Sequence, residues 1–218
     1  MWYIIRMAFA DLLEIVGDEP VFETGLLMAG SVDSKDVRRQ LSRWTRAGHL
    51  HQLRRGLYAL APPFQKVKPH PFVVANRMMR GSYVSLQSAL AYYGLIPDVV
   101  PVTTSVTTGR PNQWQTPLGI YTFQHIKTDL FIGYRLVDLG GNQQAFIATA
   151  EKALLDLVHL QPGGDSAAYL QELRLQDTQR LDLDRLQRQA ALSSSPKLRR
   201  AAAFVVKLAQ AERQYERL

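Results

Sequence analysis

The sequence predicts an α+β protein, in which an N-terminal winged helix-turn-helix precedes a larger mixed α/β domain with a helical C-terminal tail. Helical periodicity and an arginine-tipped hairpin pattern fill residues 1–61. A proline-rich segment, residues 62–71, fixes the backbone and blocks helix formation, so we expect a hinge there. In residues 72–218, valine- and threonine-rich strand patterns give way to helical patterns after residue 149.

Three helices are expected in the N-terminal domain. Apolar residues at helical spacing predict the first two over residues 8–16 and 21–29. A third helix is expected over residues 34–47. Ser34 is a good N-cap, because its hydroxyl can accept a hydrogen bond from an unpaired amide of the first turn, and Gly48 can end the helix.

The third helix divides into two faces at about 100° per residue. Val37, Leu41, Trp44 and Gly48 fall on one arc, which can pack on a small core. On the opposite arc every long charged side chain is basic. The members of this arc are Lys35, Arg38, Arg39, Ser42, Arg43 and Arg46. Guanidinium groups suit phosphate oxygens and guanine edges, so we expect this arc to contact double-stranded DNA.

A hairpin is expected after this helix, with strands over residues 49–53 and 57–60. The turn between them holds Arg54, Arg55 and Gly56, and glycine supplies the backbone conformation that a tight turn needs. A basic helix followed by an arginine-tipped hairpin is the pattern of a winged helix-turn-helix. We expect Arg54 and Arg55 to reach an adjacent minor groove or the DNA backbone.

Charge is unevenly distributed along the chain. Residues 34–68 carry nine basic side chains against Asp36 alone, a net charge of +8, whereas the whole chain carries +7. A charged helix face is most often simply solvated, but the single sign and its continuation into the hairpin favour a polyanionic partner. A second basic segment lies in the last expected helix, where Arg199, Arg200 and Lys207 form a candidate second DNA-contacting face.

The larger domain is expected to be mixed up to residue 149 and helical beyond it. Its predicted strands cover residues 100–108, 118–126, 134–139 and 145–147, with a loop over residues 111–117. Its predicted helices cover residues 71–80, 84–93, 150–160, 165–175, 183–192 and 196–218.

No catalytic residue, metal or cofactor is expected. The chain has no cysteine, its histidines lack the spacing of a zinc site, and its Gly-Gly pairs lack the motif of a phosphate-binding loop. Glu151, Lys152 and Asp156 could belong to a metal nuclease, but in a helix Glu151 and Lys152 point about 100° apart, so structural hydrogen bonds are the preferred interpretation. With no membrane-spanning run and no signal-peptide pattern, a cytoplasmic protein is expected.

Several short motifs occur in a fixed order between residues 9 and 160. They are Gly48-His49-Leu50, Leu53-Arg54-Arg55-Gly56-Leu57-Tyr58, Ser85-Leu86-Gln87-Ser88-Ala89-Leu90, Gly94-Leu95, Val102-Thr103 and Glu151-Lys152-Ala153-Leu154-Leu155-Asp156. With this order the chain resembles the AbiEi-type antitoxins of bacterial type IV, abortive-infection toxin–antitoxin systems. The segment after Pro162 resembles them only in being helical.

The resemblance implies a two-part protein. The winged helix would bind inverted repeats in its own promoter and repress the operon, and the C-terminal domain would counteract a nucleotidyltransferase-like toxin, with or without stable binding to it. Two alternatives remain: a repressor whose C-terminal domain senses a ligand, which a buried polar pocket in residues 71–218 would favour, and a DNA-directed nuclease.

Overall fold

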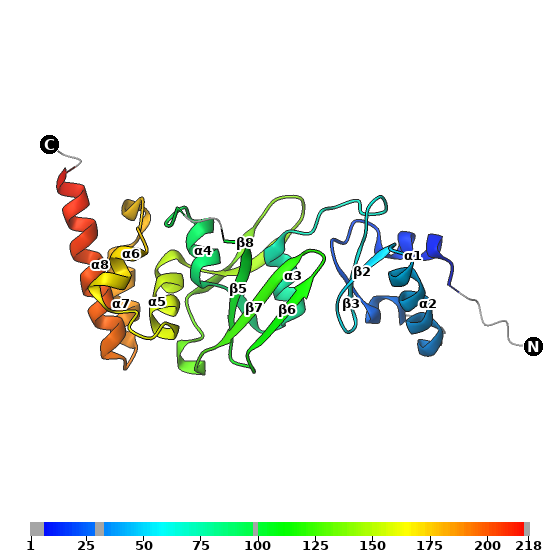
Figure 1. Ribbon diagram of the computed structural model, residues 1–218, viewed down its shortest axis with the longest axis horizontal. Coiled ribbons are helices and arrows are strands. Elements are labelled where there is room, and N and C mark those ends of the chain that lie inside the picture. The colour runs from blue at the N-terminus through cyan, green and yellow to red at the C-terminus, as the bar shows by residue number, and fades with distance from the viewer. Residues whose placement is uncertain (1–6, 29–32, 98–99, 216–218) are drawn as a thin grey trace, which may run out of the picture.

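The computed structural model describes residues 7–28, 33–97 and 100–215 and shows an elongated α+β molecule (Figure 1). Within these residues there are eight α-helices and two β-sheets. The N-terminal elements lie at one end of the long axis, the six-stranded sheet lies in the middle, and the last four helices lie at the other end (Figure 1). No helix of this part of the chain is long and apolar enough to cross a membrane.

The N-terminal region is a small helical layer on a three-stranded antiparallel sheet of order β1-β3-β2. In chain order its elements are α1 (Phe9–Val16), β1 (Phe22–Glu23), the 3₁₀ helix η1 (Thr24–Met28), α2 (Ser34–Arg46), β2 (Leu50–Arg54) and β3 (Leu57–Leu60). Leu12 of α1, Leu27 of η1, Leu41 of α2 and Leu50 of β2 are buried together and form its core.

Two expectations for this region are wrong. Residues 22–28 form the short strand β1 and the 3₁₀ helix η1 instead of one helix over residues 21–29, and residue 29 lies outside the described residues. Val21 and Phe22 are both buried, but they face opposite sides of the chain and belong to different hydrophobic clusters, as successive residues of a strand do. Phe22 also pairs with Tyr58 of β3. The cap of α2 is Asp33 rather than Ser34, because the Asp33 carboxylate accepts the N–H of Lys35 at 2.9 Å.

The larger region is built on a six-stranded mixed sheet of order β6-β7-β5-β4-β9-β8. β4 and β9 run parallel, as do β5 and β7, and the remaining pairs are antiparallel. The strands are β4 (Ser82–Val84), β5 (Val102–Thr107), β6 (Asn112–Thr116), β7 (Gly119–His125), β8 (Tyr134–Asp138) and β9 (Gln144–Ala148). The expected strands near 100–108, 118–126, 134–139 and 145–147 are therefore confirmed.

Two strands of this sheet, β6 and β4, were not expected from the sequence. The predicted loop over residues 111–117 contains β6, a polar edge strand that turns Trp114 onto Phe123 with ring centroids 5.3 Å apart. The predicted helix over residues 84–93 is shorter, because Val84 ends β4 and Ser85 lies between β4 and α4. Edge position explains the first miss, since only one side of β6 is paired and its composition stays polar.

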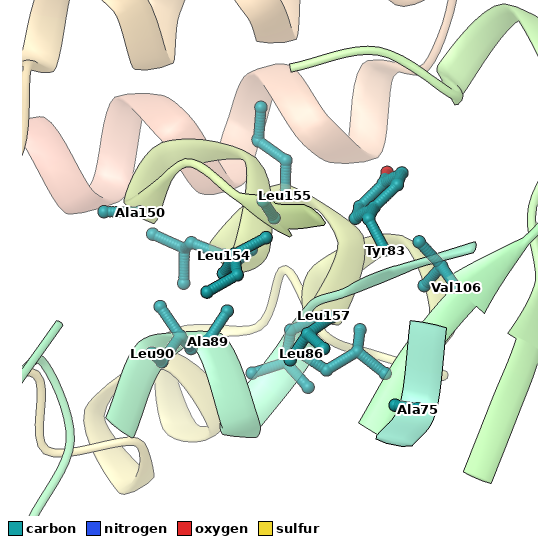
Figure 2. Close-up of a cluster of buried hydrophobic side chains, with 14 of the residues drawn as sticks. Ala75, Tyr83, Leu86, Ala89, Leu90, Val106, Ala150, Leu154, Leu155 and Leu157 are labelled. Atoms are coloured by element: carbon teal, nitrogen blue, oxygen red, sulfur yellow. The ribbon is translucent and has the colours of Figure 1, made fainter. Parts of the chain in front are cut away.

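The helices of the larger region lie near the residues expected for them. They are α3 (Pro71–Met78), α4 (Leu86–Tyr92), α5 (Ala150–Leu160), α6 (Ala167–Glu172), α7 (Leu183–Leu192) and α8 (Pro196–Tyr215), with short 3₁₀ helices η2 (Thr128–Leu130) and η3 (Thr178–Arg180). Figure 2 shows the centre of the core, where Leu86 and Leu90 of α4 meet Leu154 and Leu157 of α5.

The N-terminal sheet packs against the larger region. Val21, Leu53, Leu57 and Ala59 belong to the same buried cluster as the core of the six-stranded sheet, and β2 lies against β6. The proline-rich segment is also held, because the Gln143 side chain accepts the N–H of His70 at 2.8 Å and donates to the carbonyl of Lys68 at 3.1 Å.

Candidate nucleic-acid interface

The α2 helix is anchored by one side only. Val37, Leu41 and Trp44 are buried in the N-terminal core, and Trp44 meets Phe9 edge to face at 5.3 Å. After α2 ends, Gly48 adopts a φ of +75° and His49 donates its N–H to the carbonyl of Trp44 at 2.9 Å. This cap satisfies carbonyls of the last turn and directs the chain into β2.

The opposite side of α2 is exposed to solvent over its whole length. This surface, which we call the α2 basic face, consists of Lys35, Arg38, Arg39, Ser42, Arg43 and Arg46, and all six residues are exposed. The division of the helix into a buried arc and an exposed basic arc is thus as expected from the sequence. Five long cations on one face of a thirteen-residue helix create a strongly positive surface.

One acidic side chain lies beneath this face. Asp36 is almost completely buried, and its carboxylate forms an ion pair with Arg39, whose side chain is 73 % exposed. The spacing of three residues that allows this contact is visible in the sequence, but the significance of Asp36 was missed there. Asp36 fixes the direction of Arg39 and leaves it able to reach a ligand in solvent.

Two other acids of the N-terminal region pair with the larger region rather than with α2. Glu23 pairs with Arg80 at 2.8 Å and Glu19 with Arg77 at 3.9 Å, both on or just after α3. Within the described residues, no carboxylate other than that of Asp36 lies within 4.0 Å of a basic group of α2. The α2 basic face is therefore not neutralised by the larger region.

The two arginines of the hairpin lie in different environments. Arg55 is exposed in a two-residue turn with Gly56, whose φ is +81°. Arg54 bends toward the larger region and donates to the carbonyls of Arg55 at 3.0 Å and Arg77 at 3.3 Å. Of the pair, only Arg55 projects freely from the tip, because the inner side of the hairpin is occupied by the larger region.

The turn of the hairpin is held beside α2. Thr24 of η1 donates its N–H to the carbonyl of Gly56 at 2.9 Å, a contact that the sequence did not predict because residues 21–29 were expected to be helical. As a result Arg55 and Arg38 line one hollow together with Thr24, Met28 and Tyr58. The structure thus brings the end of the hairpin and the first half of α2 onto one surface.

The second basic set lies far from the first. We call Arg199, Arg200 and Lys207 the α8 set; all three are exposed, but Arg200 is bonded to Asp165 at 2.7–2.8 Å. α8 and α2 lie at opposite ends of the molecule (Figure 1). The two basic sets therefore do not form one continuous surface.

The acidic motif of α5 is structural in its contacts. Glu151 accepts the N–H of Asp182 at 2.9 Å, while Lys152 and Asp156 form a buried pair with N–O distance 2.5 Å. Burial raises the pKa of Asp156, and its hydrogen bonds to Lys152 and Ser85 oppose that rise. Among the described residues, no group of three histidine, aspartate or glutamate side chains is placed to hold a metal ion.

Comparison with protein-family models gave no match for this chain, and comparison with curated proteins gave none either.

Proposed function

We propose that the protein is a DNA-binding antitoxin of the AbiEi type, which binds operator DNA through α2 and the hairpin of β2 and β3. The observation that carries the DNA-binding part is the α2 basic face, because five exposed cations share one side of a helix whose other side is buried. The major groove of B-DNA is about 12 Å wide and admits an α-helix. In this proposal Arg38, Arg39, Ser42, Arg43 and Arg46 contact base edges and phosphates, and Lys35 contacts the backbone.

The arrangement around α2 supports a winged helix-turn-helix. Two short helical segments, α1 and η1, precede α2, and a hairpin follows it in a three-stranded sheet with β1. In DNA-bound proteins of this type one helix enters the major groove and the wing contacts backbone or minor groove. We assign the wing contact to Arg55, since Arg54 is bonded to the carbonyl of Arg77.

The DNA-binding proposal is tested with fluorescently labelled duplex from the promoter of the protein's own operon. We expect retarded migration and saturable anisotropy, and a loss of about 1–3 kcal/mol in binding free energy for Arg43→Ala if it reads a base. Arg188→Ala is the matched control, because Arg188 is an exposed arginine on α7 at the far end of the molecule. Equal affinities of the two variants, or no binding at low salt, would refute the proposal.

The antitoxin role is proposed from the motifs in residues 48–58, 85–95 and 151–156. In this role the larger region counteracts a nucleotidyltransferase-like toxin, without need for a stable complex and by binding rather than catalysis. Co-expression gives the test: growth arrested by the product of a neighbouring nucleotidyltransferase-like gene should be restored by the full chain. Restoration should survive Arg43→Ala, because the toxin-directed function is assigned to the larger region. Continued arrest with well-folded protein present would contradict this role.

A ligand-responsive repressor is the second candidate function. It is favoured by a cavity in the larger region, lined in part by Lys152, His159 and Ser195. The nuclease alternative has no comparable support. The Asp156 carboxylate, which would have to bind a metal ion, already accepts hydrogen bonds from Lys152, Ser85 and Tyr83.

A further inference from the structure

A cavity of about 460 Å³ opens between η2, α5 and the connection from α7 to α8. This volume lies in the range of small-molecule pockets, about 300–1,000 Å³. The helices that border it, α5, α7 and α8, lie at the end of the molecule opposite to α2 (Figure 1), so the cavity is separate from the α2 basic face. We call it the α5–α8 cavity.

Part of the inner wall is apolar, and the mouth exposes further apolar side chains. Leu130, Leu155 and Leu198 line the wall, while Ile132 and Leu192 at the mouth are 47 % and 78 % exposed. Leu192 is mostly exposed to water at the end of α7, so covering it with an apolar ligand lowers the free energy of the complex. The apolar part of the lining therefore favours a ligand with a hydrocarbon or aromatic body.

Basic side chains also lie on the lining of the same cavity. Burial lowers the pKa of the His159 imidazole, and the nearby ammonium groups of Lys197, Lys152 and Lys127 lower it further against the opposing effect of Asp156. His159, Lys152 and Lys127 all line the cavity. Three lysines against the two carboxylates of Asp156 and Asp129 leave a net charge of +1 around the cavity.

Two of these lysines retain unused hydrogen-bonding capacity. The Lys152 ammonium, on a side chain 6 % exposed, carries three donors, and within the described residues Asp156 is its one hydrogen-bond acceptor. Lys127 is exposed and has no carboxylate within 4.0 Å in that part of the chain. The Gln189 side-chain oxygen on the lining is buried and has no donor among the described residues. A bound anion would accept from the lysines.

We propose that the α5–α8 cavity binds a small organic anion with an apolar body, its charged head beside Lys127, Lys152 and His159. A carboxylate or a phosphate ester satisfies the same donors, and the apolar body lies against Leu155 and Leu198. A ligand hydroxyl or amide near Gln189 would satisfy its buried oxygen.

Binding is tested on the full chain with 8-anilinonaphthalene-1-sulfonate, a fluorescent apolar anion, which is then displaced by octanoate, octyl phosphate or octanol. We expect saturable fluorescence and displacement by both anions at concentrations at least about tenfold below that needed for octanol, a difference of about 1.4 kcal/mol. The better of the two anions identifies the preferred head group. Octanol as effective as both anions would overturn the proposal and indicate a purely apolar surface, such as a contact for a protein partner.

Charge-reversal variants locate the site. Lys127→Glu should weaken dye binding about tenfold or more, whereas Lys68→Glu, on another exposed lysine in the proline-rich segment, should leave it within about twofold. Leu192→Glu, at a mostly exposed position where folding is not at risk, should weaken it as well. Unchanged affinity in Lys127→Glu and Leu192→Glu, or no saturable dye binding by the wild-type chain, would overturn the proposal.

Discussion

Replacing Lys152 with methionine should destabilise the larger region strongly, because it leaves a buried carboxylate without its cation. Asp156 is 1 % exposed and its partners are the Lys152 ammonium at 2.5 Å, the Ser85 hydroxyl at 2.7 Å and the Tyr83 hydroxyl at 3.0 Å. Breaking a buried ion pair by removing one partner costs about 3–5 kcal/mol. The two hydroxyls still donate hydrogen bonds to Asp156 in the variant, so we expect the free energy of unfolding to fall by about 3 kcal/mol.

The assay is urea unfolding at pH 7.5, followed by far-ultraviolet circular dichroism. Lys152→Met is compared with the double variant Lys152→Met/Asp156→Asn, which removes both charges and should recover most of the loss. The deficit of the single variant should also shrink as the pH falls. Burial already raises the pKa of Asp156, and the variant lacks the opposing ammonium, so protonation neutralises the carboxylate in the folded state first. A single variant within about 1 kcal/mol of wild type, or a double variant no better than the single, would refute this reasoning.

Three further predictions concern the other parts of the molecule. Trp44→Ala should cost about 3–5 kcal/mol in urea unfolding, because Trp44 is buried in a small core; a loss under about 1 kcal/mol would contradict that packing. Burial lowers the pKa of His70 below 6.5 while its Nδ1 caps α3 through the N–H of Phe72, so this stability is present above pH 6.5 and is lost as the pH falls through the folded-state value. Asparagine caps a helix at both pH values, so between pH 7.5 and pH 5.5 the melting temperature should fall less for His70→Asn than for wild type. Equal falls in melting temperature would exclude His70 as the source of this pH dependence. Reversing all three charges of the α8 set should weaken operator binding in an anisotropy titration if that set contacts DNA. Unchanged affinity would show that the α8 set is a solvated surface that does not contact the operator.

The central parts of the fold were predictable from local pattern. α2 and the hairpin could be placed because an amphipathic period, a glycine after the helix and a glycine turn agree with one another. The segment from Val21 to Met28 could not, since the neighbouring buried residues Val21 and Phe22 belong to different cores and β1 exists only by pairing with β3. β6 was missed for the related reason that an edge strand need not be apolar.

The candidate interface was predictable in its helix and less so in its hairpin. Solvent exposure of the α2 basic face follows from its opposition to Leu41 and Trp44 on the same helix. The position of Arg54 depends on where the larger region packs, which no local pattern contains. The α5–α8 cavity is likewise invisible in the sequence, because Lys127, Lys152 and Leu192 come together only through the packing of three separate segments.

The salt dependence of operator affinity measures most directly whether the α2 basic face neutralises DNA phosphates. If about six phosphates are neutralised per protein, the plot of log K against the logarithm of the salt concentration should have a slope of about −5. Lys35→Ala and Arg38→Ala should each make the slope shallower by about one phosphate contact, while Arg188→Ala leaves it unchanged. A slope near zero, or the same slope in all three variants, would contradict the assignment of DNA binding to this face.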